Sequence, residues 1–99
     1  MYAVIFEVYL KEEGKDEYLA IAAKLKEQLV KVEGFISVER FESIVTEGKL
    51  LSLSFWEDEK AIRTWKGNLD HLMAQRKGKE ELFSDYRIRI SEVKRDYSM

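Results

Sequence analysis

The segment from Tyr2 to Leu10 would place apolar side chains on both faces of an extended strand. It is rich in β-branched and aromatic residues and too short for a typical helix, which indicates a β-strand. One face carries Tyr2, Val4, Phe6, Val8 and Leu10, and the other carries Ala3, Ile5, Glu7 and Tyr9. A strand of this kind lies at the centre of a sheet or is covered on both sides.

The next elements are a helix and a hairpin. Apolar residues recur with helical spacing from Lys15 to Val32, and Gly34 is well placed to end that helix. Alternating patterns from Phe35 to Ile44 and from Lys49 to Trp56 then predict two strands joined by a turn at 46–48.

The last part of the chain predicts a broken helix and a final strand. Asp58 is a plausible N-cap for a short helix that is interrupted at 67–68. A further helix is expected from about Asp70 to Leu82, and its polar middle contains a glycine, so it should pack weakly. The final strand is expected from Tyr86 to Val93.

The predicted order β-α-β-β-α-β is that of a ferredoxin-like α+β fold. It implies one domain over residues 1–99, with a four-stranded antiparallel sheet and helices on one face. The other face of the sheet would then expose apolar side chains of the first strand. A second copy of the chain is the simplest cover for such a face, so we expect a homodimer.

Composition excludes several classes of function. Seventeen basic and nineteen acidic side chains give a net charge of −2, which offers no general attraction to nucleic acid or to an anionic membrane. The chain has no cysteine and one histidine, so disulfides, thiolate catalysis and a protein-only metal site are not expected. We expect a cytoplasmic protein, since the first residues do not resemble a signal peptide.

A few residues could carry chemistry. His71 is the one side chain that ordinarily titrates near neutrality, and the alternative is that it caps or decorates the start of a helix. Glu7 lies inside an apolar strand, where burial would raise its pKa and suit it to accept a proton. Pairing with Arg40, Arg87 or Arg89 is the structural alternative. Trp56 and Trp65 could line a pocket or belong to the core.

Four stretches of the sequence resemble the antibiotic biosynthesis monooxygenase (ABM) domain family. They are GFISVERF at 34–41, LSLSFWEDEKAIRTW at 51–65, N-x-x-H-x-x-A-Q at 68–75 and YRIRISEV-x-RDY at 86–97. The resemblance implies a ferredoxin-like fold, a dimer whose two sheets form a barrel, and a pocket between sheet and helices in each subunit. Some members of that family oxidise aromatic intermediates with O2 and no cofactor, and others bind and break haem.

The resemblance argues against haem breakdown in this chain. The haem-degrading members use an asparagine in the first strand, a tryptophan in the second helix and a histidine about ten residues further on. Trp65 matches the tryptophan, but Glu7 stands for the asparagine and Gln75 for the histidine.

The leading hypothesis is a cofactor-independent monooxygenase that acts on an apolar aromatic or quinol-like small molecule. Such a reaction needs a base, a donor for the developing oxyanion and an apolar pocket. The candidates are His71 or Glu7 as base, Arg40 or Tyr86 as donor, and Trp56, Trp65 and Phe83 as walls. A dimer that binds or senses a small molecule without turnover is the alternative, and haem binding is a more remote one.

Overall fold

The computed structural model describes residues 1–76 and 82–99 of the chain. Within them, strands and helices follow in the predicted order, and a short 3-10 turn (Glu12–Gly14) precedes the first helix. The elements are β1 (Tyr2–Leu10), α1 (Lys15–Leu29), β2 (Phe35–Glu42), β3 (Lys49–Trp56), α2 (Glu59–Arg76) and β4 (Phe83–Glu92).

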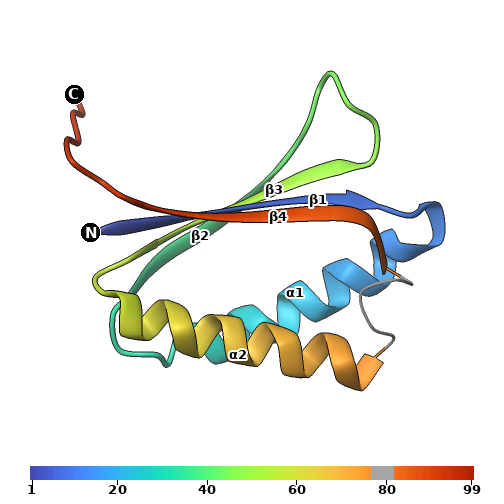
Figure 1. Cartoon of the computed structure of the whole chain (residues 1–99), viewed down its shortest axis with the longest axis horizontal. Helices are drawn as coiled ribbons and strands as arrows, with labels where there is room; N and C mark the ends of the chain where they lie inside the picture. The colour runs from blue at the N-terminus through green and yellow to red at the C-terminus, as the bar shows by residue number, and fades with distance from the viewer. Residues whose placement is uncertain (77–81) are drawn as a thin grey trace.

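The four strands form one antiparallel sheet in the order β2-β3-β1-β4. Strand β1 is therefore interior, as its two apolar faces predicted, and β2 and β4 are the edges. Both helices lie on one face of the sheet (Figure 1). This arrangement is the ferredoxin-like α+β fold, and the sequence prediction of it is confirmed.

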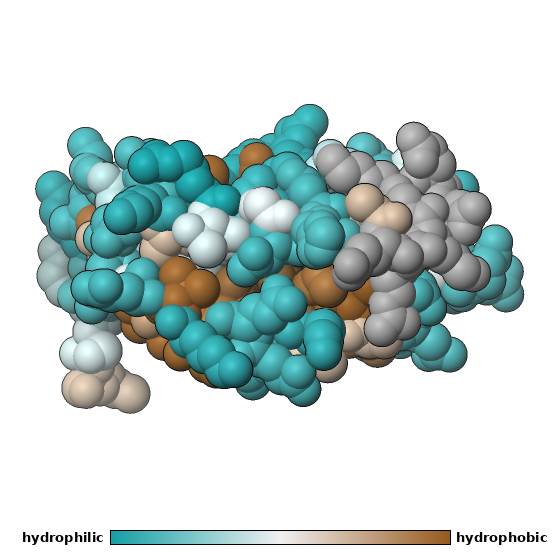
Figure 2. All heavy atoms as spheres, turned by 90° about the horizontal axis from the view of Figure 1, so that it is seen from below, coloured by the Kyte–Doolittle hydropathy of each residue, from teal (hydrophilic) through white to brown (hydrophobic). Residues whose placement is uncertain are grey.

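The hydrophobic core lies between the sheet and the two helices. Val4, Phe6 and Val8 of β1 point into it and are almost fully buried. The helices contribute their apolar stripes, whose members include Ile21, Leu25 and Leu29 of α1, and Ile62, Trp65, Leu69, Leu72 and Met73 of α2. The outer surface of the helix layer is mostly hydrophilic, with apolar side chains visible between the charged ones (Figure 2).

The predicted break in the second helix is wrong. Helix α2 runs without interruption from Glu59 to Arg76, through Gly67 and Asn68. A glycine inside a helix costs about 1 kcal/mol relative to alanine. The apolar residues on either side of it, Trp65 and Leu69, are both buried. Their burial outweighs the local preference for a break. Asp58 caps this helix as predicted, because its side chain accepts a hydrogen bond of 2.9 Å from the backbone N–H of Ala61.

Other boundaries shift by a few residues. Helix α1 ends at Leu29 rather than Val32, and Gly34 lies in the following turn with a φ of 97°. Strand β2 ends at Glu42, and β4 begins at Phe83, three residues before the predicted start. The polar middle of the predicted third helix lies partly at 77–81, outside the described residues.

The face of the sheet opposite the helices carries a mixed surface. Ile5 pairs with Leu53, and Ala3 pairs with Phe55, which places apolar side chains next to one another across β1 and β3. Phe41 on β2 adds a side chain that is 43% exposed.

Neither helix of the described residues combines the length and the apolar character that a membrane span requires.

Candidate functional site

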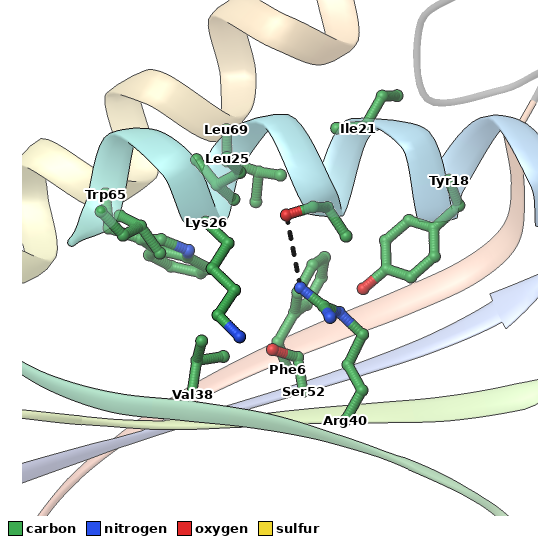
Figure 3. Close-up of a pocket in the computed structure, with 12 residues that line it drawn as sticks. Phe6, Tyr18, Ile21, Leu25, Lys26, Val38, Arg40, Ser52, Trp65 and Leu69 are labelled. Atoms are coloured by element: carbon green, nitrogen blue, oxygen red, sulfur yellow. Dashed lines mark hydrogen bonds between the residues drawn. The ribbon is translucent and has the colours of Figure 1, made fainter.

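A small cavity lies between α1 and the sheet, close to the edge strand β2 (Figure 3). Its walls are Phe6, Tyr18, Ile21, Ala22, Leu25, Lys26, Leu29, Val38, Arg40, Ser52, Trp65 and Leu69. The free space is about 20 Å³, which is on the scale of one water molecule. A larger ligand would therefore have to displace side chains at its mouth.

Helix α1 presents one row of side chains to this cavity. Tyr18, Ala22 and Lys26 are spaced by four residues, so they lie above one another on the same side of the helix. Ala22 has the smallest side chain of the three, and the guanidinium of Arg40 lies between the phenol of Tyr18 and the ammonium group of Lys26 (Figure 3). Tyr18 is only 2% exposed, whereas Lys26 is exposed at the mouth.

The sheet presents a second row. Arg40 on β2 pairs with Ser52 on β3, which in turn pairs with Phe6 on β1, so all three side chains point towards the helices. One terminal N–H group (Nη2) of Arg40 donates to the backbone carbonyl of Ala22 at 3.4 Å. The Nε of Arg40 is buried, and it has no hydrogen-bond partner within the described part of the chain.

The hydroxyl of Tyr18 lies beside the guanidinium of Arg40 (Figure 3). Burial raises the pKa of the Tyr18 hydroxyl above its ordinary value, and the neighbouring Arg40 guanidinium opposes part of that rise. The phenol is therefore protonated at neutral pH and can donate a hydrogen bond. This end of the cavity offers hydrogen-bond donors to an oxygen atom of a ligand.

The opposite end of the cavity is apolar. Trp65 and Leu69 of α2 and Leu25 of α1 form this wall, and Trp65 is 4% exposed. The ring of Phe6 meets that of Trp65 edge to face, with centroids 6.0 Å apart. Flat apolar molecules suit such a wall because aromatic edges and faces attract one another.

The structure brings two of the predicted ligand-binding residues together. Trp65 and Arg40 both line the cavity. Trp56 does not line it; this residue is fully buried, and its indole nitrogen donates to the Ser54 hydroxyl at 2.9 Å. Phe83 and Tyr86 contact Phe6 in edge-to-face geometry and lie outside the cavity lining.

The two predicted bases lie elsewhere. His71 is exposed on α2 and does not contribute to the cavity wall. Glu7 points from the open face of the sheet, where its carboxylate lies 3.0 Å from Lys49 Nζ and 3.0 Å from Arg89 Nη1. The hydrogen bond from Lys49 lowers the pKa of Glu7, and the charges of Lys49, Arg89 and Arg87 add to this effect against desolvation. Of the two predicted alternatives for Glu7, the structure shows pairing with an arginine, and that arginine is Arg89.

The sequence reasoning missed three polar groups of the cavity: Tyr18, Lys26 and Ser52. Tyr18 falls on the apolar stripe of α1, which indicates a core residue, and nothing in the sequence around Lys26 indicates a site. The spacing of four between Tyr18, Ala22 and Lys26 could have identified this row. Among residues 1–76 and 82–99, no group of three or more acidic or histidine side chains is placed to hold a metal ion.

Comparisons with known proteins identify relatives of this chain. The chain is 42% identical over 93 residues to a Pyricularia oryzae protein named jasmonate monooxygenase ABM. That match covers 94% of this chain but 43% of the fungal protein, so the chain spans less than half the length of that relative.

Solved structures share the fold at low sequence identity. Rv0793 from Mycobacterium tuberculosis superposes with a TM-score of 0.81 at 17% identity, over 98% of both chains. SnoaB, a cofactor-independent oxygenase from Streptomyces nogalater, gives a TM-score of 0.74 at 14% identity, over 96% of this chain and 94% of its own. The model of the family described as antibiotic biosynthesis monooxygenase matches residues 1–77, and the chain belongs to that family.

Proposed function

We propose that the chain is a monooxygenase that inserts one atom of O2 into an apolar aromatic or quinol-like small molecule without a resident cofactor. The observation that carries this proposal is the cavity under α1, where a guanidinium and a phenol face an aromatic wall. Family membership supports the reaction class, and the name of the fungal relative supports it as well.

The reaction balances without an external reductant when the substrate carries an activated methylene group. Loss of a proton gives an enolate or phenolate, which passes one electron to O2. The resulting substrate radical and superoxide combine to a peroxide. Loss of water from the peroxide then leaves a carbonyl, so that CH2 and O2 become C=O and H2O. The substrate supplies all four electrons.

The cavity residues have distinct roles in this proposal. Arg40 holds the oxygen on which negative charge develops, because a fixed cation in an apolar site stabilises an oxyanion strongly. Tyr18 donates a second hydrogen bond to the same oxygen. Trp65 and Phe6 hold the aromatic part of the substrate and exclude water from the intermediate.

The identity of the base stays a prediction. His71→Ala tests it directly by the rate of oxygen uptake: loss of most turnover would assign the base to His71, and retained turnover would remove that assignment. The same experiment applies to Glu7 through Glu7→Gln, although its carboxylate lies on the other face of the sheet from the cavity.

The cavity supports haem breakdown less well than oxygenation of a small molecule. Of the positions named for haem, Trp65 lines the cavity, whereas Glu7 points away from it. A haem titration followed in the visible spectrum tests this alternative.

We also infer that two copies of the chain pair through the open face of the sheet. The partly exposed apolar side chains of Ile5, Leu53 and Phe55, together with Phe41, support this interface because contiguous apolar patches on sheets are seldom left bare.

Oxygen uptake measured with an electrode tests the proposed function. The substrates to try are anthrone, a naphthoquinol and jasmonate, with labelled O2 used to trace one oxygen atom into the product. Uptake that saturates with substrate and falls at least about tenfold in Arg40→Gln is expected. Binding without uptake for every substrate would favour the alternative of a sensing module.

A further inference from the structure

The cavity carries an excess of positive charge. Arg40 and Lys26 line it, and none of its described lining residues is an aspartate or a glutamate. Within residues 1–76 and 82–99, neither cation forms an ion pair with a carboxylate. A charge beside an apolar wall is unfavourable unless an opposite charge or hydrogen-bond acceptors compensate it.

The hydrogen bonding of Arg40 is also incomplete. A guanidinium has five N–H donors, and this one donates to the Ala22 carbonyl at 3.4 Å and also hydrogen-bonds with the hydroxyl of Tyr18. Its Nε is buried without a partner in the described part of the chain. Buried donors without an acceptor are uncommon in folded proteins, so this N–H is available to an acceptor that enters the cavity.

Side chains surround the position where that acceptor would lie. The Tyr18 hydroxyl points to the guanidinium from one side, and Lys26 reaches towards the cavity from the same helix, one turn beyond Ala22 (Figure 3). The three groups are donors towards a shared space at neutral pH. An oxygen that carries full negative charge satisfies such a site better than a neutral carbonyl, because hydrogen bonds to ionised groups are stronger.

We propose that the cavity takes its ligand as an anion, with an ionised acidic group between Arg40 and Lys26 and an apolar body against Trp65. The acidic group is either a carboxylate on the ligand or an acidic enol or phenol. That the ligand is a substrate rests on the proposed function. That the cavity binds an anion does not depend on it.

This inference changes what the enzyme has to supply. Among the described residues of the cavity wall there is no carboxylate or imidazole to act as a base. Two cations stabilise the ionised form of an acidic substrate, so the substrate can enter already deprotonated or lose its proton to water. The oxyanion of the proposed reaction would then be present before O2 arrives.

Calorimetric titration with two matched pairs of compounds tests the proposal. The first pair is the carboxylate naphthaleneacetate and its neutral methyl ester. The second is a nitronaphthol, ionised near neutral pH, and unsubstituted naphthol, which is neutral. The wild-type protein is expected to bind at least one anion about tenfold more tightly than its neutral partner, and this preference should weaken as salt is raised.

Three variants locate the preference. Arg40→Gln and Lys26→Met should each bring the affinities of anion and neutral partner to within about threefold of one another. Lys24→Met removes an equally charged, exposed side chain of α1 that does not line the cavity, and it should keep the full preference. Because Lys26 is exposed, its variant remains informative even if Arg40→Gln does not fold.

The outcomes separate the two proposals. Preference for the carboxylate alone would place the acidic group on a substituent of the ligand, and preference for the ionised phenol would place it at the reacting oxygen. Equal affinity for charged and neutral partners would overturn the inference, as would full preference in both cavity variants or no saturable binding of any compound. Oxygen uptake is absent from this measurement, so a failure of the proposed oxygenase activity would leave its result intact.

Discussion

The carboxylate of Glu7 on β1 lies 3.0 Å from the ammonium group of Lys49 on β3, on the face of the sheet that carries no helix. Lys49 also stands over the ring of Tyr9, with its Nζ 5.1 Å from the ring centroid. Hydrogen bonds to Tyr9 and Glu7 raise the pKa of Lys49, while Lys49 lowers that of Glu7. Both the carboxylate of Glu7 and the ammonium group of Lys49 are therefore charged at neutral pH.

The lowered pKa of Glu7 predicts a stability that depends on pH. A carboxylate with a folded-state pKa below its unfolded value stabilises the fold above the unfolded pKa, and this contribution is lost as pH falls through the folded pKa. Glu7→Gln should therefore have a lower melting temperature than the wild type at neutral pH. The difference should shrink as pH falls below the ordinary range of a glutamate. A difference that stays constant with pH would contradict the linkage, and both proteins are to be compared at one concentration.

Replacement of Gly67 by alanine should stabilise the protein by roughly 0.5–1 kcal/mol. The residue is helical and exposed, and a Cβ added there would meet no atom within 4 Å. Chemical denaturation measures the change. Gly14→Ala is the contrast, because its Cβ would lie 2.6 Å from the backbone oxygen of Leu82, and that variant should be destabilised. Equal effects of the two substitutions would contradict this account.

Removal of the cap of α2 should lower stability. Asp58→Ala deletes the acceptor for the Ala61 backbone N–H, and we expect a loss of about 1 kcal/mol in the free energy of unfolding. Asp58→Asn keeps an acceptor oxygen and should retain most of the wild-type stability. If both variants lost the same amount, the charge of Asp58 would matter more than its hydrogen bond.

A charge on the open face of the sheet should prevent pairing of two copies. Leu53 lies next to Ile5 across the β1–β3 ladder, so Leu53→Glu would place a carboxylate in the middle of the proposed interface. Light scattering after size exclusion should give a dimer mass for the wild type and a monomer mass for the variant. Lys24→Glu, on exposed α1, serves as the control and should remain a dimer. A monomeric wild type would remove the proposed interface.

The sequence predicted the sheet well because its signals are local and repeated along each strand. The two apolar faces of β1 and the alternation of β3 depend on side-chain periodicity alone. The break at Gly67 was predicted from the same kind of local signal and failed. Burial of Trp65 and Leu69 against the core is a tertiary effect that no window of sequence records.

The candidate site could be predicted only in part. Arg40 and Trp65 were identified by residue type, but most of their neighbours in the cavity come from three other elements, β1, α1 and β3. Tyr18 is far from both in sequence, and its ring fits the apolar pattern of a core helix. Pairing of Glu7 with an arginine was one of the two alternatives predicted, and Arg89 is that partner, but its second partner, Lys49, was not predicted. Cross-strand pairing of this kind depends on register, which composition does not give.

Strand β2 carries one wall of the cavity and is also an edge of the sheet, bonded to β3 on one side only. A displacement of this strand away from α1 would disturb a single ladder and leave β1 and β4 in place. One wall of the cavity is thus built from an edge strand, which a single neighbouring strand holds in place. Substitutions in β2 and in the Tyr18–Ala22–Lys26 row can change the size of the molecule that the cavity admits without altering the central strands. The scaffold and its selectivity can therefore vary independently.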